Sequence, residues 1–198
     1  TDLGGEATLT IGSVEINGRG AGGVIADLTL AAGTVRVQAR APNVKMTLDA
    51  AVGIEDPNRF DGKGTVADSD IDTLLGIAGL AAADAGAVRG RVSSSIAFKG
   101  DLRHLPATTV TLDVSPIDAT VFVVPIAIGR GLRASVADGR VQVDNTGIAV
   151  GGLAMSLGGT LATDRSTGKL LLDVEGDLGS LTPWLNRLGV SGDVAGAG

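Results

Sequence analysis

Cysteine and tyrosine are absent from the 198 residues, and histidine occurs once, as His104. The lack of cysteine excludes disulfides and thiolate metal sites. Aromatic residues make up only 2% of the chain, although 44% of it is hydrophobic. Compact cores normally rely on bulky aromatic side chains. The apolar mass here is carried by Val, Leu, Ile and Ala, which is typical of repetitive strands with thin packing.

Long hydrophobic runs and an excess of basic residues are also missing. A membrane-spanning helix needs roughly 18 consecutive apolar residues, and the longest candidates, residues 74–83 and 121–128, are too short; the second also contains Pro125. The net charge is −6, with acidic and basic residues interspersed. Nucleic-acid binding usually requires a basic stripe, so we expect no nucleic-acid partner.

Alternation of apolar and polar residues dominates what is present. Such alternation predicts strands with one apolar and one polar face, and pairs such as Asn-Gly and Asp-Gly predict tight hairpins. We predict about a dozen short antiparallel strands, with clear alternation at 9–11, 26–30, 35–39, 44–48, 110–114, 141–143, 153–157 and 170–174. Turns are predicted at 17–18, 61–62, 138–139, 145–147 and 166–168.

Two segments, near residues 69–80 and 182–188, break this alternation and predict short helices. Each has capping chemistry followed by apolar residues at helical spacing. They also define a loose internal repeat of about 100 residues. We therefore expect residues 1–198 to form one segment of a longer repeat protein.

Candidate catalytic and metal-binding residues all have a simpler structural interpretation. His104 has no neighbouring ligand cluster, Asp68, Asp70 and Asp72 fit helix capping better than a calcium loop, and Ser93–Ser95 lacks a nearby base. The glycine-rich segment 18–23 precedes a strand instead of the helix that a dinucleotide loop requires. We expect no enzymatic activity, no cofactor and no metal.

Covering the apolar faces requires a sandwich, a closed barrel or a curled open sheet with short capping helices. The scarcity of aromatics disfavours a thick core between two sheets. The 31 glycines favour curvature and bulges. We predict an all-β fold built on a curved antiparallel sheet.

The order of several blocks resembles the TamB/AsmA-like family of envelope proteins. These blocks are GRVSSSIAFKGDLRHLPATTVTLDV (90–114), VADGRVQVDNTGIAVGGLAMSLGGTLA (136–162) and the run from Val174 to Leu185. The resemblance implies a β-taco, which is a curved sheet that forms an open hydrophobic groove. It also implies a protein of the periplasm, anchored to the inner membrane outside this segment, that takes part in phospholipid transport or outer-membrane biogenesis. An outer-membrane partner of the Omp85 type would bind parts outside this segment.

The expected groove lining is the set of aliphatic residues, with Phe98, at alternate strand positions, and phospholipid acyl chains are the expected ligand. The sequence does not determine which side of each strand would face the groove. The alternative hypothesis is a structural β-solenoid or adhesin stalk without lipid. The lining residues would be Leu28, Leu30, Val35, Val37, Val44, Met46, Leu48, Ile96, Phe98, Val110, Leu112, Val114, Val141, Val143, Leu153, Met155, Leu170, Leu172 and Val174.

Overall fold

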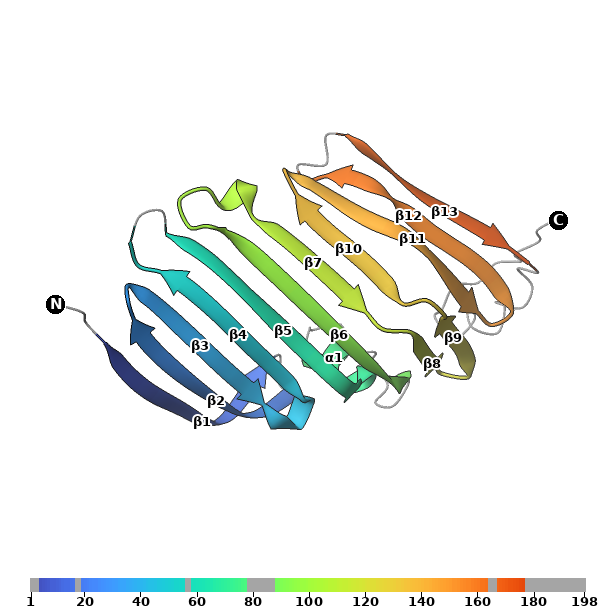
Figure 1. Cartoon of the computed structure of the whole chain (residues 1–198). Helices are drawn as coiled ribbons and strands as arrows, with labels where there is room; N and C mark the ends of the chain where they lie inside the picture. Colours follow the sequence, from blue (N-terminus) through green and yellow to red (C-terminus); the bar gives the residue numbers. More distant parts are fainter. Residues whose placement is uncertain (1–3, 17–18, 56–57, 78–87, 164–166, 177–198) are drawn as a thin grey trace.

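A computed structural model describes residues 4–16, 19–55, 58–77, 88–163 and 167–176. The predicted all-β fold is confirmed: this part of the chain forms one large, curved antiparallel sheet of thirteen strands (Figure 1). The strands are β1 (Gly5–Ile16), β2 (Arg19–Ala31), β3 (Thr34–Ala41), β4 (Met46–Gly53), β5 (Arg59–Asp70), β6 (Val88–Asp101), β7 (Thr109–Val114), β8 (Ile117–Val121), β9 (Val124–Ile128), β10 (Leu132–Ala137), β11 (Arg140–Val150), β12 (Leu153–Ala162) and β13 (Gly168–Glu175).

Nearly every strand pairs with its neighbour in sequence, so the sheet is a meander. The apparent exceptions are β7 to β10. Both β7 and β8 pair with β6, while both β9 and β10 pair with β11. Strands β7 and β8 together therefore act as one long strand with an interruption, and so do β9 and β10. Among the described strands, β1 and β13 form the edges of the sheet, at opposite ends of the ladder in Figure 1.

Within the described ranges, three short helices accompany the sheet: α1 (Ile71–Ile77) and the 3-10 turns η1 (Pro42–Val44) and η2 (Leu105–Ala107). Helix α1 follows β5 and contacts β2, β5 and β6 near one end of the sheet. Asp70 caps it, because its Oδ1 accepts the Thr73 N–H at 3.0 Å. The predicted helix near 69–80 is present from Ile71 to Ile77, while the predicted helix near 182–188 lies outside the described residues.

A line of irregularities, which we call the crease, crosses the sheet from β5 to β11. The β5 ladder slips at Ala67–Asp68, and the long strands break at Ser115–Pro116 and at 129–131. The β11 ladder slips at Asp144–Asn145. Bulges bend strands and increase their twist. The crease thus divides the strands into a longer part and a shorter part. The shorter part lies at the strand ends that carry α1, β8 and β9 (lower in Figure 1).

Several local predictions were wrong. The 44–48 strand begins only at Met46, because Val44 belongs to η1 and Lys45 adopts a left-handed backbone (φ 49°). The predicted turn at 61–62 lies within β5, and the one at 145–147 lies at the bulge inside β11. The turn at Asp138–Gly139 is confirmed, with φ of 49° and 68°, as expected for the tightest hairpins.

Candidate functional site: an uncovered apolar face

The strand register brings the alternating apolar residues onto one side of the sheet, which we call the apolar face. Directly paired residues of antiparallel strands point to the same face, so the pairs define rows that cross the sheet from β1 to β13. The first row is Ala7, Leu28, Val37, Ala50, Gly62, Phe98, Val110, Val136, Val141, Leu161 and Gly168. The second is Leu9, Ala26, Ala39, Leu48, Gly64, Ile96, Leu112, Ala134, Val143, Gly159 and Leu170.

Neither row contains a charged or polar side chain. With about 4.8 Å between neighbouring strands, each row runs roughly 48 Å along the sheet. A single leaflet of membrane hydrocarbon is about 15 Å thick. The apolar track is therefore roughly three times as long as one leaflet is thick.

The apolar face is half-buried along most of its length and exposed at several positions. On the second row, Leu9 is 53% exposed, Leu48 36% and Leu170 45%, although aliphatic residues of this size are usually buried in soluble domains. Among the described residues, the buried apolar side chains of the core are few, namely Val44, Val88, Val124, Val150 and Leu153. An aliphatic track of this length with several exposed side chains is typical of interaction surfaces.

The register places nearly all of the expected lining residues on this face. Eighteen of the nineteen lie there, including Leu30, Val35, Met46, Val114, Met155, Leu172 and Val174. Val44 is the exception, because it is 2% exposed within η1 and lies outside the strand ladder. Leu153 is on the face but buried, also at 2%, so it offers no surface to a ligand.

The apolar face also contains several side chains that were not among the expected lining residues. Leu9 and Ile11, both exposed, come from the edge strand β1. Their alternation with threonines predicted one apolar face for this strand, and the register with β2 places that face on the same side as Leu28. Phe60 and Val136 belong to the face as well.

Glycine allows the two phenylalanines of this face to lie across neighbouring strands. Phe98 pairs with Gly62, and a Cβ at Gly62 would lie 2.4 Å from the Phe98 Cζ. Reciprocally, Phe60 pairs with Gly100, where a Cβ would lie 2.7 Å from the Phe60 Cζ. The ring centroids are 6.3 Å apart, within the range of favourable aromatic pairs. Each glycine thus makes room for the ring of its cross-strand partner.

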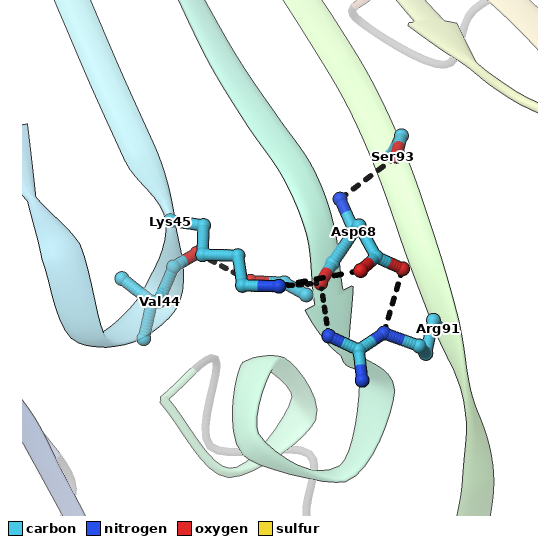
Figure 2. A network of polar contacts seen from close by, with 6 residues as sticks. Val44, Lys45, Asp68, Arg91 and Ser93 are labelled. Carbon is cyan, nitrogen blue, oxygen red and sulfur yellow. Dashed lines mark hydrogen bonds and ion pairs between the residues drawn. The ribbon is translucent and has the colours of Figure 1, made fainter.

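A polar network fixes the crease where β5 bulges (Figure 2). Asp68 has a left-handed backbone (φ 50°), its N–H donates to the Ser93 Oγ at 2.8 Å, and its carboxylate accepts from Arg91 Nε at 2.6 Å. Lys45 Nζ adds an ion pair with Asp68 at 3.2 Å. The Arg91 guanidinium, followed by the Lys45 ammonium, lowers the pKa of the Asp68 carboxyl. These contacts explain Asp68 and Ser93 as structural residues.

The remaining candidates for chemistry are not assembled into a site. His104 is exposed, and its Nδ1 lies 3.9 Å from an Asp101 carboxylate oxygen. The described residues contain no group of three acidic or histidine side chains arranged around a metal position. In that same part of the chain, no helix is long and apolar enough to span a membrane.

The opposite, polar face carries a shallow hollow of about 570 Å³. Two carboxylates and two ammonium groups line it, from Asp49, Asp61, Lys63 and Lys99. Because the formal charges cancel, the hollow favours neither an anion nor a cation. The apolar face therefore remains the stronger candidate.

No protein-family model, curated protein or solved structure matches the chain.

Proposed function

We propose that the apolar face lines an open hydrophobic groove that carries phospholipid acyl chains, and that the chain serves lipid transport between the inner and outer membranes or outer-membrane biogenesis. The observation that carries this proposal is the pair of uncharged rows that cross the sheet without interruption and remain partly exposed. The resemblance to TamB/AsmA-like proteins supports the same proposal and suggests the periplasm as its location.

The energetics suit transport better than storage. Full burial of a sixteen-carbon chain is worth on the order of 12 kcal/mol at about 0.8 kcal/mol per CH₂. A chain lying on an open surface buries roughly half of its area, so the gain is on the order of 6 kcal/mol. After the association and ordering costs of binding, that gain leaves only weak, reversible binding. Because neighbouring positions along the rows are chemically equivalent, a bound chain can slide among them.

The alternative of a lipid-free structural stalk is less well supported. A β-solenoid stalk stabilises itself with a filled interior. Across the ranges that the structure describes, few apolar side chains are fully buried, and exposed leucines lie on the face that a solenoid would turn inward.

The test uses two substitutions on neighbouring positions of β7. Leu112→Asp places a carboxylate in the second apolar row, whereas Thr111→Asp places the same group on the polar face. Phospholipid that co-purifies with the chain is measured by mass spectrometry, and transfer between labelled donor and acceptor vesicles is measured by fluorescence. We expect Leu112→Asp to lose both signals and Thr111→Asp to retain them.

Folding of both variants is checked by far-UV circular dichroism. The proposal fails if the unaltered chain carries and transfers no phospholipid, or if a folded Leu112→Asp variant transfers it as well as Thr111→Asp does.

A further inference from the structure

The edge strand β13 carries one apolar residue that breaks its alternation. Lys169, Leu171 and Asp173 share the polar face, yet Leu171 is a leucine that is 48% exposed. The apolar face of the same strand carries Leu170, Leu172 and Val174, which are also exposed. Within the described residues β13 pairs only with β12. An exposed apolar edge of this kind is a template for pairing with another strand.

The hydrogen-bond pattern identifies which backbone groups face outward. The Ala162 N–H donates to the Thr167 carbonyl at 2.7 Å, and the β12–β13 register continues from there without a shift. Because bonded and non-bonded pairs alternate in antiparallel ladders, Lys169, Leu171 and Asp173 bond inward to β12. The N–H and C=O groups of Gly168, Leu170, Leu172 and Val174 therefore point away from the sheet.

We propose that β13 is a dimerisation strand, through which two copies of the chain pair antiparallel about a two-fold axis at Leu171. This register places Leu170 opposite Leu172 of the second copy and Gly168 opposite Val174, so all outward-facing groups of the strand find partners. It also places Lys169 of each copy opposite Asp173 of the other, giving two ion pairs between oppositely charged side chains. The two Leu171 side chains meet between them, which accounts for a leucine on the polar face.

The symmetry of this contact has a structural consequence. A two-fold axis perpendicular to the sheet keeps the same face on the same side in both copies. The apolar faces of the two sheets would therefore join into one surface, with Leu170 and Leu172 alternating across the junction. The dimer itself depends on the β13 edge alone and would form whether or not the face carries lipid.

The oligomeric state of the 198-residue chain tests the proposal, using light scattering after size exclusion. We expect a dimer whose dissociation constant rises about tenfold or more with Lys169→Asp, since each ion pair becomes a repulsion. The double variant Lys169→Asp/Asp173→Lys restores opposite charges and should restore the dimer. Lys99→Asp makes the same charge change away from the edge and should leave the dimer intact.

Cross-linking tests the register, because the chain has no cysteine of its own. In Leu171→Cys the two thiols lie at a directly opposed pair, with Cα atoms about 4.5 Å apart, so oxidation should give a covalent dimer. Leu172→Cys is comparably exposed, but its two copies lie on a diagonal of roughly 7–8 Å and should cross-link poorly.

A monomeric chain would overturn the proposal, and so would a dimer that is insensitive to Lys169→Asp. Cross-linking through Leu172→Cys in place of Leu171→Cys would overturn the register.

Discussion

Substituting Gly62 by alanine tests whether the Phe98 ring lies flat across β5. The added Cβ would lie 2.4 Å from the Phe98 Cζ and 2.9 Å from the Ala50 Cβ, closer than such atoms can approach. The ring must rotate away, which exposes it and breaks its contact with Phe60. Overpacking of this kind typically costs about 1–3 kcal/mol. The lower entropy of the unfolded alanine chain offsets about 0.4–1 kcal/mol of that, leaving a net destabilisation of up to about 2.5 kcal/mol.

Gly147→Ala is the matched control. Gly147 also lies within a strand, but a Cβ there would meet no atom within 4 Å, so the substitution should stabilise the fold slightly. Urea unfolding followed by circular dichroism measures both variants. With a slope of roughly 2–3 kcal/mol per molar urea, the two midpoints should differ by roughly 0.5–1 M.

A double-mutant cycle makes this prediction specific to the ring. In a Phe98→Leu background the clash at Gly62 is largely removed, so Gly62→Ala should cost much less there. Equal effects of Gly62→Ala in both backgrounds, or a Gly62→Ala chain as stable as Gly147→Ala, would refute the packing of Phe98 over this glycine.

Three further substitutions probe the turns and the crease. Asp68→Asn keeps a side chain that tolerates the left-handed backbone but removes the charge. Because the pKa of Asp68 is lowered in the folded chain, its charge stabilises the fold at pH values above the unfolded pKa of about 3.9. The loss in Asp68→Asn should therefore be complete at pH 7 and should disappear as the pH falls through the lowered folded pKa, as urea titrations at several pH values would reveal; a pH-independent difference would contradict this. Ala32→Asn should raise the free energy of unfolding by about 1 kcal/mol, since Ala32 and Gly33 both have positive φ (46° and 69°) and asparagine is favoured there; an unchanged urea midpoint would count against it. Ser69→Ala removes the buried hydroxyl that donates to the Val44 carbonyl and should lower the free energy of unfolding by about 1–3 kcal/mol. Ser95→Ala removes a hydroxyl from β6 and serves as the control. Equal losses of stability in the two variants would argue against a special role for Ser69.

Alternation was sufficient to predict most of the strands and that each has one apolar face, because a period of two depends only on local sequence. Val37, Leu48 and Leu112 lie on one face of the sheet as their alternation with polar neighbours indicates. The cross-strand register, which assembles these residues into rows, depends on pairing between distant segments and is not encoded in any single strand.

The glycine positions show why turn chemistry was less reliable. Asp61–Gly62 has the composition of a hairpin turn, but Gly62 serves to accommodate the Phe98 ring from the next strand. Asn145–Gly147 likewise lies beside the β11 bulge instead of in a turn. Glycine is required both by turns and by close cross-strand packing, and only the tertiary arrangement distinguishes the two.

The crease was also invisible in the sequence. It arises where irregularities of separate strands come into line, from Asp68 in β5 to Asp144–Asn145 in β11. By itself, Asp68 suggested helix capping and Asn145 suggested a turn. Their common position depends on strand lengths and register, which are properties of the whole sheet.

Site-specific photo-cross-linking to lipid tests the central proposal most directly. A photoreactive residue at Ile96 would lie in the second apolar row, and one at the adjacent exposed Ala97 would lie on the polar face. After irradiation with phospholipid vesicles, we predict phospholipid adducts by mass spectrometry from position 96 and few or none from position 97. Equal labelling at both positions, or no adduct at position 96, would contradict lipid binding on the apolar face.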